Sequence, residues 1–207
     1  AGSPTPSIVA GLAPRALACD GRAVPAWVFG YGSLLFRPGF AHGRAELAEL
    51  RGYARRFHQG SPDHRGTPER PGRVVTLVED EGAVTTGLAF ELDDRDAEAV
   101  LAALDVREQG GYARAEVEVR TSSGTVRATT WIARPGNPHW LGPAPFDAIA
   151  AHVLASSGPS GTNAEYVLRL DETLARLGSR DAHVAELAAH VRRAMRDAAA
   201  DPVQDAR

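Results

Sequence analysis

The run Tyr112-Ala113-Arg114-Ala115-Glu116-Val117-Glu118-Val119-Arg120 alternates small apolar residues with charged ones. Successive side chains of a β-strand point to opposite faces, so this alternation predicts a strand with one buried and one solvated face, as in antiparallel sheets. Thr121-Ser122-Ser123-Gly124 has the composition of a turn, and residues 125–133 are again β-favouring. The two runs are therefore predicted to form an antiparallel pair.

Further strands are expected on the N-terminal side of this pair. Residues 27–31 form an apolar, β-favouring run, and residues 52–59 alternate aromatic and polar types imperfectly. Residues 73–78 and 87–92 are also β-rich, and Glu79-Asp80-Glu81-Gly82 between them predicts a hairpin. The segment from the end of the first run to Leu50 is expected to be a loop with a short apolar piece.

Helices are expected in two parts of the chain. Asp93-Asp94 can cap a helix that runs to about Val106, and further helices are predicted at about 145–157, 162–178 and 181–197. The predicted fold class is α+β, with a small antiparallel β-barrel or curled sheet flanked by helices and a helical C-terminal third. We expect one domain over 26–198, between a flexible N-terminal extension (1–25) and a flexible C-terminal tail (199–207).

Composition argues against several classes of protein. The 207 residues are 43% hydrophobic and 24% charged with a net charge of −3, so no basic surface for nucleic acid is expected. No apolar run reaches the roughly 18 residues that a membrane helix needs. The single cysteine, Cys19, excludes an intrachain disulfide and a CxxC centre, and a cytoplasmic location is expected. The histidines form neither H-x-x-x-H nor H-x-x-E-H, which argues against a zinc hydrolase.

A glycine turn follows the first apolar run. Gly30 and Gly32 stand two residues apart, where glycines let the backbone approach a ligand closely and aim successive N–H groups at one point. We therefore predict that residues 31–34 hold a carboxylate. Ser33 is not expected to be a nucleophile, because Tyr31 and Leu35 occupy the glycine positions of the G-x-S-x-G elbow. A hydroxyl that stabilises the turn or donates to the ligand is the favoured interpretation.

Glu108 is the acid whose position makes it a candidate for a catalytic role. It lies where the predicted helix ends, next to Arg107 and just before the paired glycines 110 and 111, which turn the chain into the strand at Tyr112. A structural salt bridge is the alternative. The other acids near it in sequence fall on predicted exposed faces and turns.

Five motifs occur in one order along the chain, and together they carry a resemblance. They are Phe29-Gly30-Tyr31-Gly32-Ser33-Leu34; Asp63-His64-Arg65-Gly66-Thr67-Pro68 followed by Pro71-Gly72-Arg73-Val74-Val75-Thr76-Leu77; Arg107-Glu108-Gln109-Gly110-Gly111-Tyr112; Asn137-Pro138 with Leu141-Gly142-Pro143-Ala144-Pro145; and Gly158-Pro159-Ser160-Gly161-Thr162-Asn163-Ala164-Glu165-Tyr166. Over about residues 26–195 the chain resembles the ChaC family of glutathione-specific γ-glutamylcyclotransferases.

The resemblance implies a γ-glutamylcyclotransferase-like fold and cleavage of glutathione to 5-oxoproline and cysteinylglycine, with no metal and no cofactor. The family's catalytic glutamate falls on Glu108, and the tyrosine that lines its pocket falls on Tyr166. Its substrate loop falls on Tyr31, Gly32, Ser33 and Leu34. Glutathione is the implied small-molecule partner, and no nucleic acid, membrane or obligate protein partner is evident.

The implied reaction suits these residues, because the α-amine of the γ-glutamyl group attacks its own γ-carbonyl and needs no enzyme nucleophile. A carboxylate whose pKa is raised by partial burial can take a proton from that amine and later give one to the leaving amine. The turn amides are expected to hold either the α-carboxylate or the γ-carbonyl oxygen. Arg65 is expected either to meet the glycine-end carboxylate of the substrate or to brace its loop.

Two other functions remain open at this stage. One is a cyclotransferase for other γ-glutamyl peptides or γ-glutamyl amines. The other is a non-catalytic interaction protein, because the family was first linked to regulation of cation transport. An intact Glu108 favours the enzyme.

Overall fold

A computed structural model describes residues 25–200 of the chain. Residues 1–24 and 201–207, which hold Cys19 and nearly all of the predicted extension and tail, lie outside the described residues. The described elements are, in order, β1 (Ala26–Gly30), the 3₁₀ helix η1 (Ser33–Leu35), β2 (Ala45–Ser61), β3 (Gly72–Leu92), α1 (Ala97–Arg107), β4 (Tyr112–Thr121), β5 (Gly124–Ala133), α2 (Phe146–Leu154), β6 (Ser157–Gly158), β7 (Gly161–Thr162), α3 (Asn163–Arg176) and α4 (Ala182–Ala200).

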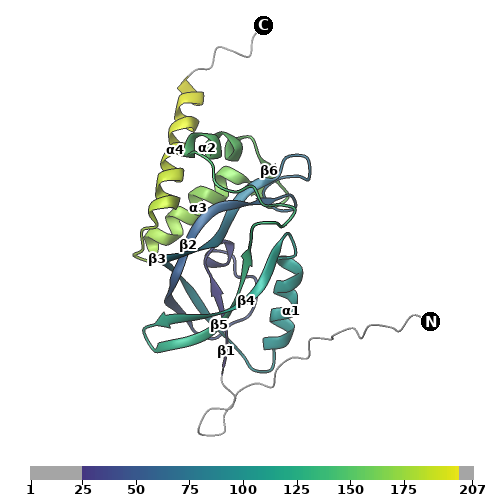
Figure 1. Cartoon of the computed structure of the whole chain (residues 1–207), viewed down its shortest axis with the longest axis vertical. Coiled ribbons are helices and arrows are strands. Elements are labelled where there is room, and N and C mark those ends of the chain that lie inside the picture. The colour runs from purple at the N-terminus through teal and green to yellow at the C-terminus, as the bar shows by residue number, and fades with distance from the viewer. Residues whose placement is uncertain (1–24, 201–207) are drawn as a thin grey trace, which may run out of the picture.

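Five strands close into a barrel in the order β1-β3-β2-β4-β5 (Figure 1). Four neighbouring pairs are antiparallel, but β1 and β5 run parallel, with Val28 opposite Thr129. The expectation of a wholly antiparallel barrel is therefore wrong in this detail. An odd number of strands cannot alternate in direction all the way round a closed ring, so one neighbouring pair has to be parallel. The α+β class, the barrel and the helical C-terminal third are confirmed.

β2 and β3 are much longer than the sequence indicates. The segment expected to be a loop before Leu50 is the first part of β2, and both parts of the predicted hairpin belong to β3. They do not pair with each other: Glu79 lies opposite Tyr53 and Val84 lies opposite Arg51, so residues 80–83 bulge out of one continuous strand. Acidic residues and glycine in the sequence indicate an interruption of strand pairing. They do not show whether the chain turns back on itself or bulges, because here both parts of β3 pair with β2.

Helices cover the barrel on two sides, α2 to α4 on one and α1 on the other (Figure 1). The larger core joins barrel residues such as Phe29 and Phe57 to Leu170 of α3 and Leu187 of α4, and the smaller one joins Val28 to Leu104 of α1. Burying each such side chain contributes about 1.5–3 kcal/mol. Because Val28 and Phe29 enter different cores, β1 is fixed from both sides, and so is the turn that follows it.

Within residues 25–200, no helix is long and apolar enough to cross a membrane.

Candidate active site

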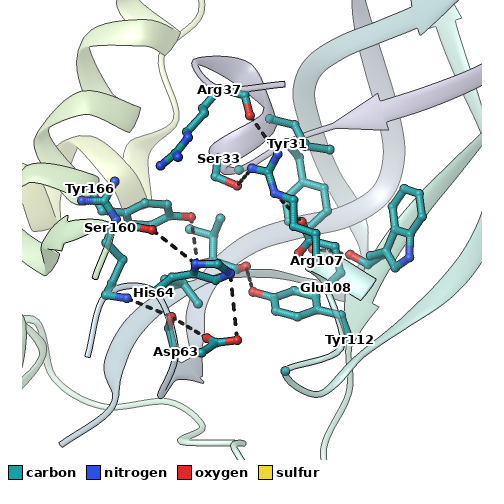
Figure 2. A pocket seen from close by; sticks show the side chains of 18 of the residues that line it. Tyr31, Ser33, Arg37, Asp63, His64, Arg107, Glu108, Tyr112, Ser160 and Tyr166 are labelled. Atoms are coloured by element: carbon teal, nitrogen blue, oxygen red, sulfur yellow. Dashed lines mark hydrogen bonds and ion pairs between the residues drawn. The ribbon is translucent and has the colours of Figure 1, made fainter. Parts of the chain in front are cut away.

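A cavity of about 330 Å³ opens where β1 ends, beside the loop after β2, the start of β4 and helix α3 (Figure 2). The elements that form it are far apart in sequence, and the barrel brings them together. Its lining includes all the residues that the sequence predicts for the site, namely Tyr31, Gly32, Ser33, Leu34, Arg65, Glu108 and Tyr166.

The glycine turn forms one wall of this cavity. After β1 the chain enters η1, in which the Leu35 N–H donates to the Gly32 carbonyl over 3.1 Å. Within the described part of the chain, the N–H groups of Gly32, Ser33 and Leu34 have no acceptor, as is usual for the first turn of a helix. A Cβ on Gly32 would lie 3.3 Å from Tyr166 Oη, so the backbone passes close to that hydroxyl.

Arg55 fixes the start of the turn from inside the barrel. Its side chain is buried, and its Nε donates to the carbonyl oxygen of Tyr31 over 2.8 Å. The charge is balanced by Asp181, whose Oδ2 lies 2.7 Å from Arg55 Nη1. Because the C=O and N–H of a trans peptide point in opposite directions, this bond also sets the direction of the Gly32 N–H.

Glu108 lies directly after the C-terminal end of α1, and its side chain enters the cavity (Figure 2). The side chain is only 18% exposed. Burial raises the pKa of the Glu108 carboxyl above its ordinary value, and the positive charge of Arg107 opposes this. The sequence-based expectation of a carboxyl whose pKa is raised by partial burial agrees with this geometry.

The turn that follows Glu108 is held by two paired side-chain amides, that of the buried Gln59 and that of the partly buried Asn137. Gln59 Nε2 donates to the Gly110 carbonyl over 2.9 Å, and the side-chain amides of Gln59 and Asn137 bond to each other over 3.0 and 3.2 Å. Gly111 has a φ of 101°, and a Cβ there would lie 2.5 Å from Asn137 Oδ1. Only glycine fits this position, and the position of Glu108 therefore depends on it.

Arg107 links Glu108 to the glycine turn. Its Nε lies 3.4 Å from Glu108 Oε1, and its Nη2 donates to Ser33 Oγ over 2.9 Å. Nη1 donates to the carbonyl oxygens of Arg37 and Pro38. The Ser33 hydroxyl oxygen accepts this bond and so helps to hold the turn, which is one of the two roles that the sequence favours.

Three tyrosine hydroxyls lie around Glu108, and burial raises the pKa of each, that of Tyr166 to about 12. Tyr31 Oη donates to the Trp131 carbonyl over 2.6 Å, and Tyr112 Oη donates to the Val75 carbonyl over 2.7 Å. Tyr166 Oη instead accepts the Val75 N–H over 3.4 Å. Within residues 25–200 the Tyr166 hydroxyl proton has no acceptor, so it remains available to a ligand.

Arg65 braces its loop, one of the two roles considered from the sequence. Its side chain is 6% exposed, and Nη1 contacts Glu165 Oε2 at 3.2 Å and the Thr162 carbonyl oxygen at 3.1 Å. Its guanidinium also lies 5.7 Å from the centre of the Tyr166 ring. Arg65 therefore helps to fix the start of α3, which carries Tyr166 into the cavity.

Several residues of the cavity are missing from the sequence-based selection. Asp63 and His64 line it, with a side-chain contact of 3.9 Å, and His64 Nδ1 lies 3.3 Å from Ser160 Oγ (Figure 2). Both are in a motif quoted above, but nothing in their local sequence indicates which way they point. Arg37 and Tyr112 also line the cavity. Within the described residues, no three His, Cys, Asp or Glu side chains are arranged to hold a metal ion.

Comparison with solved structures defines the class of fold. The crystal structure of a yeast γ-glutamyl cyclotransferase specific to glutathione matches with a TM-score of 0.76 and 30% identity, covering 82% of this chain and 96% of that one. A structure described as "Gamma-glutamyl cyclotransferase" matches with a TM-score of 0.50 at 16% identity, a likeness of fold. The molecule therefore has a γ-glutamylcyclotransferase-like fold.

Comparison of sequences gives the family. A family model described as "ChaC-like protein" matches residues 26–194. The chain is 42% identical to human glutathione-specific gamma-glutamylcyclotransferase 1, covering 89% of this chain and 84% of that protein. It is 34% identical to the glutathione-specific gamma-glutamylcyclotransferase of Escherichia coli (strain K12), covering 86% and 77%. The chain belongs to the ChaC-like protein family, and the resemblance carried by the five motifs is confirmed.

Proposed function

We propose that this protein is a γ-glutamylcyclotransferase that cleaves glutathione to 5-oxoproline and cysteinylglycine. The relatives named for that activity support the reaction class. The observation that carries the proposal is the carboxyl group of Glu108, which is largely buried in the same cavity as the glycine turn. A carboxyl beside a substrate-sized cavity with a raised pKa is the arrangement that proton transfer near neutral pH requires.

The reaction is intramolecular. The α-amine nitrogen of the γ-glutamyl group bonds to its own γ-carbonyl carbon, which closes a five-membered ring, and the bond from that carbon to the cysteine nitrogen then breaks. Nucleophile and electrophile belong to one molecule, so the protein contributes mainly by folding the substrate and excluding water. Correct orientation of this kind can supply about 7–11 kcal/mol.

Glu108 is the proposed proton carrier. As a carboxylate it takes a proton from the substrate ammonium, which frees the amine to attack. After the ring closes, its nitrogen gives up a second proton, and the cysteine nitrogen gains two protons as its bond to the γ-carbon breaks, so that it leaves as the ammonium of cysteinylglycine. Glu108 carries both protons from one nitrogen to the other, so the carboxylate is regenerated and no proton is gained or lost overall. A raised pKa suits both steps, because the group has to accept a proton and then release it.

The glycine turn and Tyr166 are the proposed binding groups for the γ-glutamyl end. The N–H groups of residues 32–34 suit a negatively charged oxygen, since they have no acceptor within the described residues. The Tyr166 hydroxyl, whose proton is also without an acceptor there, suits the γ-carbonyl oxygen as negative charge develops on it. A donor of this kind contributes a rate factor on the order of 10²–10³.

Incubation of the purified protein with glutathione tests the proposal. We expect 5-oxoproline and cysteinylglycine in equal amounts by mass spectrometry, and much slower release of 5-oxoproline from γ-Glu-Ala. Equal turnover of the two substrates would identify instead a cyclotransferase for γ-glutamyl peptides in general. Absence of 5-oxoproline from both would contradict the enzyme assignment and favour an interaction protein.

A further inference from the structure

The cationic side chains around the cavity are not equivalent. The Arg65 guanidinium already donates hydrogen bonds to Glu165 and to the Thr162 carbonyl oxygen. The Arg107 guanidinium already donates to Ser33 and to two carbonyl oxygens of the segment after η1, and it forms an ion pair with Glu108. Arg37 also lines the cavity, but within residues 25–200 its guanidinium has no hydrogen-bond or ion-pair partner. It is the arginine there that can take an anionic ligand without losing an existing bond.

The backbone of Arg37 is nevertheless fixed. Its N–H donates to the Ser33 carbonyl over 2.9 Å, and its own carbonyl oxygen accepts from Arg107 Nη1 over 3.0 Å. The side chain extends from this fixed point over the cavity, on the side where Ser160 and Tyr166 lie (Figure 2). The residue as a whole is exposed, so its guanidinium lies at the mouth of the cavity and not beside Glu108.

The geometry points to Arg37 as the residue that binds the carboxylate of the substrate's C-terminal glycine and so selects for a tripeptide. This assignment rests on the function proposed above. Glutathione carries two carboxylates, and an extended tripeptide spans roughly 10 Å, so both cannot lie at the same turn. With the γ-glutamyl end at Glu108, the glycine end reaches the mouth, where an arginine can bind a carboxylate through two parallel hydrogen bonds.

His64 is the other basic side chain at the mouth, and it is less suited to this role. The carboxylate of Asp63 lies 3.9 Å from its ring and would repel a second carboxylate. Its Nδ1 is also within 3.3 Å of Ser160 Oγ. Arg65 was the sequence-based candidate for the same carboxylate, and its bonds to Glu165 and Thr162 make Arg37 the better candidate.

A matched pair of substrates tests Arg37. Glutathione and its glycinamide have the same shape and differ only in the terminal charge. For glutathione we expect Arg37→Gln to raise KM about tenfold with little change in kcat, equivalent to about 1.4 kcal/mol of binding. For the glycinamide we expect the KM values of the variant and the unmodified protein to agree within a factor of two. Arg37→Lys should recover part of the loss, because lysine keeps the charge without the two-pronged geometry.

Arg169→Gln is the matched control for the overall electrostatic field. Arg169 lies over the Phe36 ring, 4.9 Å from its centre, and faces Glu165, outside the lining of the cavity. We expect this variant to treat both substrates as the unmodified protein does. Equal losses on the two substrates for Arg37→Gln, or no loss on either, would overturn the assignment while leaving the cyclotransferase activity in place. If the unmodified protein does not cleave glutathione, the proposed function and the Arg37 assignment both fail.

Discussion

Arg107 Nε lies 3.4 Å from Glu108 Oε1, and the other end of the same guanidinium bonds to the glycine turn. Arg107, which is adjacent to Glu108 in sequence, therefore connects the proposed proton carrier to the proposed substrate loop. The pair also sets the charge balance of the cavity, because Arg107 opposes the rise in the pKa of Glu108 that burial causes.

Replacement of Arg107 is expected to move the pH profile. In Arg107→Gln the opposing positive charge is lost, so the pKa of Glu108 rises further. The carboxylate form that acts as base then disappears at a higher pH, and the acidic limb of kcat/KM shifts to higher pH. Profiles of kcat/KM between pH 4 and 8 measure this. Arg120→Gln, which breaks an exposed pair with Glu49, is the control. An unmoved acidic limb would show that Arg107 does not act on the titrating group.

Tyr166 and Tyr112 are expected to differ although both line the same cavity. Tyr166→Phe removes the hydroxyl whose proton has no acceptor within residues 25–200, so kcat should fall about 10²- to 10³-fold. Tyr112→Phe removes a hydroxyl that already donates to the Val75 carbonyl, so it should cost about 1 kcal/mol of unfolding free energy and change kcat less. Steady-state kinetics and urea unfolding separate the two effects. Equal kcat values for the two variants would make Tyr166 a structural residue.

Gly111 and Gly124 provide a test of how Glu108 is positioned. Both have positive φ, 101° and 125°, but a Cβ on Gly111 would collide with Asn137 and Gln59, whereas nothing lies within 4 Å of one on Gly124. Each alanine variant adopts an unfavourable φ at a cost of about 1–3 kcal/mol, and the collision adds to this cost in Gly111→Ala alone. Only Gly111→Ala should also lose activity, by about 10²-fold, because it displaces the turn after Glu108. Full activity of Gly111→Ala would show that the crowded turn does not position Glu108.

His183 is expected to make stability depend on pH. It lies between the rings of Phe57 and Phe146, and its Nε2 accepts the Phe57 N–H, so the fold requires an unprotonated nitrogen there. Burial lowers the pKa of His183 to about 4. As pH falls below about 6.5 the unfolded chain binds a proton that the folded chain does not, so stability is lost between about pH 6.5 and 4.

The measurement is urea unfolding at pH 7 and at pH 5, with His183→Gln as the reference that cannot titrate. The unmodified protein should lose about 1–2 kcal/mol more than the variant between these pH values, after allowance for the partial exposure of the ring. The same loss in both proteins would mean that other groups carry the pH dependence.

The sequence was most informative where structure is local. The alternation in residues 112–120 identifies β4, because one face of that strand is buried and the other is solvated. The helices predicted at about 162–178 and 181–197 likewise correspond to α3 and α4. The hairpin predicted around Glu79–Gly82 is wrong because both halves of β3 pair with β2, a partner that no local pattern reveals. The parallel pairing of β1 and β5 follows from the closing of five strands into a ring, and no pattern in the sequence predicts that closure with five strands.

The residues of the candidate site also fall into those that the sequence reveals and those that only the fold reveals. Glu108 and the glycine turn could be found because a helix end, paired glycines and a strand end leave marks in the sequence. The Gln59–Asn137 pair could not, since its members are far apart in the chain and meet only in the folded barrel. The ion pair between Arg65 and Glu165 also forms only in the folded chain. Without knowledge of this pair, the sequence gives no reason to prefer Arg37 over Arg65 as the ligand of a carboxylate.

Release of 5-oxoproline from glutathione by Glu108→Gln tests the central claim most directly. The amide keeps the size of the side chain but cannot accept the ammonium proton, and Glu118→Gln, a change on the exposed face of β4, is the control. We expect the control to match the unmodified protein and Glu108→Gln to release 5-oxoproline at least about 10³-fold more slowly, with an unchanged unfolding transition. Full activity of Glu108→Gln would contradict the assignment of Glu108 as the proton carrier.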